Sequence, residues 1–280
     1  DSDFYYLSGF AEPESVLCII PNRPLGEFVL FCRERDRERE IWDGYRAGLE
    51  GAIEQYGADE SYPIAKLDEI MPTLMEGKKK LYVNLGGHAD FDTKVINWLN
   101  SIRAKARQGA KAPAELLMLN HLLHELRLYK SAEELAVMRK AATISANAHI
   151  KAMQKAQAGL YEYELEAELM YEFMRHGCVA PAYNTIVGSG HNACILHYTE
   201  YHRAFQSTEL LLIAAGGEYR GYAADLTRTY PVRGRWTFEQ QAIYELVLAA
   251  QKAAIAVIKP QIQWSEIQKT ILSFLTQGLK

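Results

Sequence analysis

Apolar and polar positions follow two different patterns along the chain, and the change comes near residue 127. Before that point, short apolar, β-favouring runs at 15–20, 27–31 and 80–84 are interspersed with helical patterns at 49–56 and 92–104. Turn-forming residues at 21–26 join the first two runs, which predicts a β-hairpin. The mixture of strands and helices predicts an α/β domain over residues 1–126.

The second pattern, over residues 127–280, begins with two amphipathic helices. Ser131 and Glu134 have the spacing of a capping box, and apolar residues at 137, 141, 144 and 148 predict a helix of about twenty-five residues. A second helix is predicted over 162–176, with Leu165, Leu169 and Phe173 on one face. Gly177 follows it, where a left-handed cap is expected to end the helix.

Strand-like segments follow these helices. Short strands are predicted at 185–187 and 195–198, then a hairpin over 209–230, and then a helix that begins at a capping box of Thr237 and Gln240 and ends before Pro260. This order predicts an α+β domain in which helices cover one face of a curved antiparallel sheet. The polar stretch 105–113, which ends in proline, is the segment most typical of a linker.

Composition narrows the classes of partner. A chain of 280 residues, 49% hydrophobic, is long enough for two cores, and a net charge of −4 with mixed signs argues against a nucleic-acid surface. The basic stretches 78–80 and 103–111 are therefore predicted to be solvated surface. No run of eighteen apolar residues occurs, so we expect no membrane segment. Cys18, Cys32, Cys178 and Cys194 lie in or beside apolar runs without CxxC pairing, which is typical of reduced core thiols in a cytoplasmic protein.

One carboxylate stands out in the predicted hairpin. The stretch 209–230, ELLLIAAGGEYRGYAADLTRTY, places Asp225 among apolar and small residues on its second strand. A buried, ionised carboxylate is costly unless it is paired or binds a metal, so Asp225 is a candidate site residue. The alternatives are hydrogen bonds to nearby backbone or a pair with Arg228, although their spacing along a strand places Arg228 on the opposite face.

This hairpin resembles the metal-binding hairpin of the creatinase/aminopeptidase, or pita-bread, metallopeptidase family, LLxDxGxEYxGYxxDxTRT. Asp225 matches the second aspartate of that pattern, and Ala214, which cannot coordinate a metal, stands at the first. The resemblance implies two divalent ions, commonly manganese, held by two aspartates, one histidine and two glutamates, the last three lying beyond the hairpin. Only one of the five ligands is matched, so we expect these 280 residues alone to bind metal weakly or not at all and to hydrolyse little.

The segment 183–200, YNTIVGSGHNACILHYTE, together with DSDFYYLSGFAEPES and HELRLYKSAEEL, resembles the Xaa-Pro aminopeptidases, or aminopeptidase P, of this family. The resemblance implies release of the N-terminal residue from peptides with proline in second position. It places His197 in the active-site cleft, where an imidazole can stabilise the oxyanion, and Tyr183 and Asn184 along the substrate groove. The residues alone favour a core histidine bonded to backbone, and Tyr183 is as readily a core residue.

The expected fold is thus an α/β creatinase-like domain at 1–126 followed by an incomplete α+β pita-bread domain at 127–280. Three explanations of the expected lack of hydrolysis stay open: a shortened enzyme, which is favoured, an engineered inactive variant, or a natural pseudo-peptidase that binds peptides or partners without catalysis. Whether the protein is a homo-oligomer also stays open. The seven remaining histidines are predicted to be surface or helix-face residues: His88, His121, His124, His149, His176, His191 and His202. Gln261 stands where the family usually has glycine, which predicts a strained or differently shaped turn.

Overall fold

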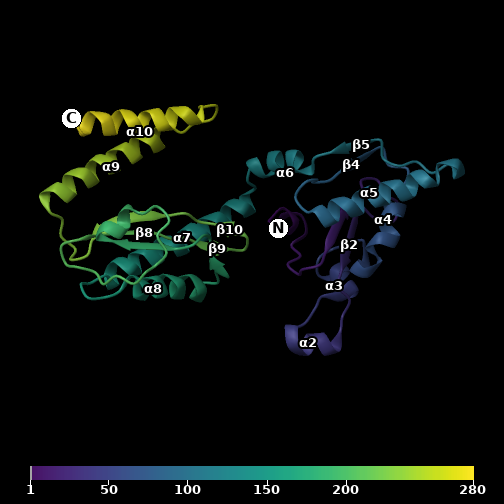
Figure 1. The fold of residues 1–280 in the computed structure, drawn as a ribbon, viewed down its shortest axis with the longest axis horizontal. Helices are drawn as coiled ribbons and strands as arrows, with labels where there is room; N and C mark the ends of the chain where they lie inside the picture. Colours follow the sequence, from purple (N-terminus) through teal and green to yellow (C-terminus); the bar gives the residue numbers. More distant parts are fainter. Residues whose placement is uncertain (1) are drawn as a thin grey trace. The chain divides into compact units, whose positions relative to one another are not determined.

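The structure is a computed structural model that describes residues 2–280, and it contains two units, one up to Ala132 and one from Glu133 (Figure 1). The domain limits of 1–126 and 127–280 stay a prediction. Among the described residues, no helix is both long and apolar enough to cross a membrane.

The first unit mixes short strands with helices. Its elements are α1 (Ser2–Ser8), β1 (Val16–Ile19), β2 (Phe28–Cys32), α2 (Arg37–Asp43), α3 (Gly48–Glu54), β3 (Glu60–Pro63), a 3₁₀ turn (Ile64–Lys66), α4 (Leu67–Met75), β4 (Lys80–Tyr82), α5 (Ala89–Ala104), a second 3₁₀ turn (Ala106–Gln108), β5 (Glu115–Leu117) and α6 (Leu119–Leu128). The predicted hairpin is confirmed, because β1 pairs antiparallel with β2. Two parallel pairs, β2 with β3 and β4 with β5, complete the sheets.

Residues 105–113 lie inside this unit, so their interpretation as a linker is wrong. They join α5 to β5, and the carbonyl of Lys111 accepts a hydrogen bond from the amide of Gly77 at 2.8 Å. Helices α4 and α5 cover the sheet with a buried cluster that includes Met71, Trp98 and Ile102.

The second unit places helices on antiparallel strands. Its elements are α7 (Ala132–Lys155), α8 (Glu162–Arg175), β6 (Ala180–Pro181), β7 (Ile186–Ser189), a 3₁₀ helix (Gly190–Cys194), β8 (Leu210–Ala214), β9 (Gly217–Tyr219), β10 (Tyr222–Ala223), β11 (Thr227–Pro231), α9 (Phe238–Val257) and α10 (Trp264–Gly278). The strands form two antiparallel sheets in the orders β11-β8-β7 and β10-β9-β6.

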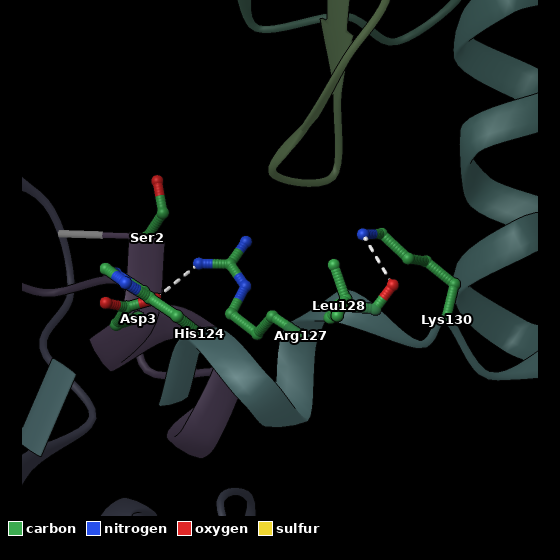
Figure 2. A pocket seen from close by; sticks show the side chains of 6 residues that line it. All are labelled: Ser2, Asp3, His124, Arg127, Leu128 and Lys130. Carbon is green, nitrogen blue, oxygen red and sulfur yellow. Dashed lines mark hydrogen bonds and ion pairs between the residues drawn. The ribbon is translucent and has the colours of Figure 1, made fainter. Parts of the chain in front are cut away.

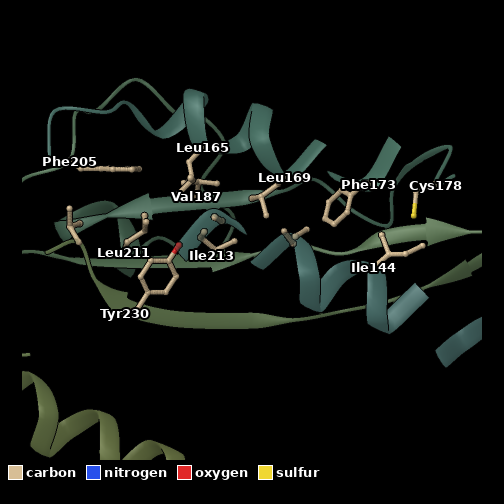
Figure 3. Packing of buried hydrophobic residues seen from close by; sticks show 14 residues of the cluster. Ile144, Leu165, Leu169, Phe173, Cys178, Val187, Phe205, Leu211, Ile213 and Tyr230 are labelled. Atoms are coloured by element: carbon tan, nitrogen blue, oxygen red, sulfur yellow. The ribbon is translucent and has the colours of Figure 1, made fainter. Parts of the chain in front are cut away.

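The core of this unit lies between α7, α8 and the sheet. Leu165, Leu169 and Phe173 point from α8 to strand residues such as Val187 and Ile213 (Figure 3). These three side chains are the face that the helical spacing predicted, and all are at most 1% exposed. Helix α8 ends as expected, since Gly177 has φ +89°. Burial of this stripe, rather than helix propensity, therefore fixes α8 on the sheet.

Two sequence-based interpretations of this unit are wrong. The segment 195–198 is not a strand, because it follows the 3₁₀ helix as a bend and a turn with Ile195 and Leu196 exposed. Cys194 is exposed rather than part of the core. All four cysteines are free in the part of the chain that the structure describes.

Candidate functional site

In the second unit the chain just after β8, at Gly216, passes very close to the chain just before β11, at Ala224. This close approach, here called the hairpin crossing, positions Asp225. Ala214, the last residue of β8, lies opposite Thr227 of β11, after which the chain leaves that ladder to form the β9–β10 hairpin. Gly216 allows this crossing, because a Cβ there would lie 1.7 Å from the carbonyl oxygen of Ala224. Asp225 consequently lies between β10 and β11, exposed, and not within a strand as the sequence pattern suggested.

Asp225 and Tyr183 are in direct contact. The Tyr183 hydroxyl donates to Oδ1 of Asp225 at 3.0 Å and also faces the carbonyl of Leu226 at 3.5 Å. Burial, followed by the hydrogen bond to Asp225, raises the pKa of the Tyr183 hydroxyl, so Tyr183 is a neutral donor at physiological pH. Arg228 instead donates to the carbonyl of Thr227, and the ion pairs of residues 2–280 do not include Asp225 with Arg228. Asp225 is thus oriented by a phenol, and the predicted alternative of a pair with Arg228 is not formed.

His197 directly precedes a residue that packs near Tyr183. Its side chain is exposed in the turn after the 3₁₀ helix, and the next residue, Tyr198, is only 4% exposed. Tyr198 forms a buried cluster with Ile186 and Ala214, and Tyr183 packs against that cluster. Asn184, which lies two residues before the start of β7, is exposed. The structure therefore joins Tyr183 to Asp225 by a hydrogen bond and places the neighbour of His197 in the cluster that contains Ala214.

A buried glutamate that the sequence interpretation missed organises the segment around His197. Glu162, the first residue of α8, is fully buried, and its carboxylate accepts hydrogen bonds from both the amide and the hydroxyl of Ser189 at 2.8 Å. It also accepts bonds from the Tyr198 hydroxyl at 2.6 Å, the Asn192 side-chain amide at 3.2 Å and the Arg203 amide at 3.2 Å. Burial alone would raise the pKa of Glu162, but these donors outweigh it and the pKa is lowered. No periodicity distinguishes such a residue from an ordinary exposed helix-start glutamate.

Two polar residues of α7, four positions apart, hold the hairpin crossing from the other side. The Ser145 hydroxyl accepts a bond from the amide of Gly217 at 3.0 Å, and Nε2 of His149 lies 3.0 Å from the carbonyl oxygen of Ala215. His149 is 3% exposed, so of the two predicted placements, surface or helix face, it has the second, on the buried face of α7. Its position directly after Ala148, on the buried face of α7, is the signal that could have revealed it.

The donors present do not fit a pair of divalent ions. Over residues 2–280, no three His, Cys, Asp or Glu side chains come together as a metal site would require. Ala214, at the first aspartate position of the family pattern, offers only a methyl group beside Ile186 and Tyr198. Divalent ions need several converging oxygen or nitrogen donors, so Asp225 alone would hold one weakly.

Two surface hollows lie elsewhere, and neither contains Asp225, Tyr183, His197 or Glu162. One, in the first unit, is lined by Ser2, Asp3, His124, Arg127, Leu128 and Lys130, with Arg127 paired to Asp3 (Figure 2). A second, in the other unit, lies beside β11 and includes Met153, Trp236 and Tyr244. Neither combines a carboxylate, an imidazole and the hairpin crossing.

Comparison with known proteins places this geometry in a family. Residues 136–280 match the family model described as metallopeptidase family M24, and residues 1–82 match the one described as aminopeptidase P, N-terminal domain. The chain is 41% identical over 280 residues to Xaa-Pro aminopeptidase of Escherichia coli, covering all of this chain and 64% of that protein. It is 32% identical over 286 residues to Xaa-Pro aminopeptidase 3 of Rattus norvegicus, covering all of this chain and 55% of that protein.

Solved structures agree with these matches. The aminopeptidase PepP of Pseudomonas aeruginosa is 55% identical, with a TM-score of 0.97, over 100% of this chain and 63% of that one. A variant of E. coli aminopeptidase P in complex with substrate gives 41% identity and a TM-score of 0.95, over 100% and 64%. The expected fold, an N-terminal creatinase-like domain followed by part of a pita-bread domain, is confirmed. The chain spans less than two thirds of the length of these relatives.

Proposed function

Because the chain belongs to metallopeptidase family M24, we propose that the protein is a metal-dependent aminopeptidase that releases the N-terminal residue from peptides with proline in second position. The observation that carries the proposal is the match to P. aeruginosa aminopeptidase PepP, 55% identical with a TM-score of 0.97 over the whole of this chain. Fold alone would not support a reaction, but the match extends over the whole chain, including the segments around His197 and Asp225.

In this proposal each residue of the site has a role. Asp225 supplies one carboxylate ligand to a pair of divalent ions, with manganese as the proposed metal, and Tyr183 orients that carboxylate through Oδ1. The exposed imidazole of His197 donates a hydrogen bond to the oxyanion formed on the attacked carbonyl. Asn184 and Tyr183 contact the substrate. The family pattern places three further ligands, one histidine and two glutamates, beyond the hairpin, and Ala214 leaves the fifth position without a donor.

The competing function is a peptide-binding protein on the same scaffold that does not catalyse. The relatives named above are all aminopeptidases, so the comparisons give no support to this alternative. We propose that the protein is located in the cytoplasm.

Hydrolysis of matched tripeptides by the full-length protein tests the proposal. A substrate with proline in second position should lose its first residue, one with alanine there should be cleaved far more slowly, and a chelator should abolish cleavage until manganese is restored. Binding of the proline peptide without cleavage, and without bound metal, would favour the non-catalytic alternative. In the aminopeptidase, His197→Gln should lower kcat by about 10²-fold, because the imidazole is the proposed hydrogen-bond donor to the oxyanion.

A further inference from the structure

Both ends of the segment 189–203 are attached to one carboxylate. At the start of the segment, the Ser189 amide and hydroxyl each donate to Oε1 of Glu162 at 2.8 Å. At its end, the Arg203 amide donates to Oε2 at 3.2 Å, and the Arg203 carbonyl accepts a bond from the Glu162 amide at 3.1 Å. Glu162 thus closes a loop of fifteen residues, counting from Ser189 to Arg203.

Two residues inside the loop bind the same carboxylate and flank its exposed part. Asn192 donates to Oε1 at 3.2 Å, and the Tyr198 hydroxyl donates to Oε2 at 2.6 Å. Asn192 and Tyr198 also bond to one another at 2.8 Å, and both side chains are buried. Between them lie the exposed residues 194–197, of which His197 is the last. The backbone on each side of His197 is therefore held by groups that Glu162 satisfies.

The charge of Glu162 suits this arrangement better than any neutral side chain would. A carboxylate is a pure acceptor, and here all five groups that face it are donors. Its position at the start of α8 places it at the positive end of the helix dipole. Among the described residues the guanidinium of Arg203 makes no direct bond to this carboxylate, because it binds Glu209 and the carbonyl and hydroxyl of Ser189. Loss of the anion would leave several buried donors without an acceptor.

We propose that Glu162 is a positioning residue: its carboxylate holds the segment 189–203 in the conformation that exposes His197 directly before Tyr198, whose side chain packs against Ala214. This inference rests on the proposed function for the role of His197, while the holding of the segment itself does not. The carboxylate acts through Tyr198 and Asn192 and does not contact substrate.

The test compares Glu162→Gln with Glu168→Gln in the full-length protein. Glu168 lies on the same helix and pairs with Lys155 at the surface, so its variant removes the same charge away from the segment. In Glu162→Gln, amide hydrogen exchange over 190–202 should become about 10- to 100-fold faster, with no comparable change elsewhere in α8. If Glu162→Gln does not fold, Tyr198→Phe removes a single donor and should accelerate exchange mainly around His197.

Kinetics separate positioning from simple destabilisation. With a proline tripeptide, Glu162→Gln should lower kcat by about 10²-fold with little change in KM, and the double variant with His197→Gln should be no slower than His197→Gln alone. Exchange no faster than in Glu168→Gln, or losses that multiply in the double variant, would overturn the inference. If His197→Gln instead keeps normal turnover, the proposed function of His197 fails, and the exchange data still decide whether Glu162 holds the segment.

Discussion

At the scale of single residues, His149 predicts how the stability of the second unit depends on pH. Burial, with a further contribution from the positive charge of Arg228, lowers the pKa of the imidazole below its ordinary value of 6.5, although the bond to Ala215 opposes the shift. Nε2 donates to the carbonyl of Ala215, and Nδ1 is buried without a partner, so a second proton would have no acceptor. The unfolded chain therefore binds a proton in a pH range where the folded protein does not.

Because the unfolded chain binds the extra proton, acid destabilises the folded protein. Stability is fully present above pH 6.5 and falls as the pH drops from 6.5 toward the lowered folded-state pKa, by at most about 1.4 kcal/mol per pH unit. His149→Gln can keep a donor to Ala215 without the titration, so its stability should change less between pH 7.5 and 5.5. Urea unfolding of both proteins at three pH values measures the difference. Equal slopes for the two proteins would contradict the assignment.

Gln261 predicts a stabilising substitution. Its φ is +69°, the left-handed region that the family's usual glycine occupies without strain. Removing that strain raises the free energy of unfolding by about 1–2 kcal/mol. The greater conformational freedom of glycine in the unfolded chain lowers it by about 0.4–1 kcal/mol. Gln261→Gly should therefore stabilise by about 0.5–1 kcal/mol in urea unfolding. Gln251→Gly is the matched control, since Gln251 is exposed inside α9 and glycine within a helix should destabilise.

The family patterns singled out residues that the structure joins, whereas the burial of polar residues was not predicted. The hairpin pattern identified Asp225 and the segment 183–200 identified Tyr183, and a hydrogen bond connects the two side chains. Glu162 and His149 were missed because polarity alone predicts exposure. Their burial depends on donors and acceptors far away in the sequence, at Ser189, Tyr198 and Ala215, which no local pattern reveals.

At the scale of secondary structure, the hairpin crossing depends on Gly216. A methyl group there would lie 1.7 Å from the Ala224 carbonyl oxygen, and this backbone atom cannot move without displacing Asp225 next to it. Gly216→Ala should thus cost about 3 kcal/mol or more in urea unfolding. Gly87→Ala is the control, because nothing lies within 4 Å of a Cβ there, and it should change stability by less than about 1 kcal/mol. Equal stabilities of the two variants would mean that the strands do not cross this closely.

Helices were predicted more accurately than short strands. Helix α8 was expected over 162–176 and runs over Glu162–Arg175, because three apolar side chains at helical spacing and Gly177 define it locally. The segment 195–198 was predicted as a strand from its apolar residues, yet it is a turn. Its Tyr198 is drawn inward by the hydrogen bond to Glu162, whereas Leu196 is 87% exposed. Tertiary hydrogen bonds thus override an apolar run this short.

At the scale of the whole molecule, the fold class was predictable because both halves carry family segments in the expected order. The alternation of strands and helices predicted an α/β domain for the first part of the chain. Helices followed by a hairpin predicted an α+β domain for the second part. The sequence could not show how much of the last two helices, α9 and α10, is buried against the rest of the second unit. Helix α9 buries only Ala250 and Ala254, and α10 buries no residue, while Trp264 at its start is 85% exposed. Such apolar exposure is typical of surface that packs against further protein.

Replacing Ala214 by aspartate tests whether the side chain at this position faces the same metal ions as Asp225. Ala214 is 9% exposed beside Ile186 and Tyr198, so a carboxylate there without a metal should destabilise the 280-residue chain by about 1–3 kcal/mol. In the full-length protein the same Ala214→Asp change should increase bound manganese and raise the melting temperature when manganese is added, because ligand binding to the folded state stabilises it. Ala214→Asn, of equal size but uncharged, should gain little of either. If Ala214→Asp bound no more metal than Ala214→Asn, the side chain at 214 would not face the same ions as Asp225, and the assignment of Asp225 as a metal ligand would be wrong.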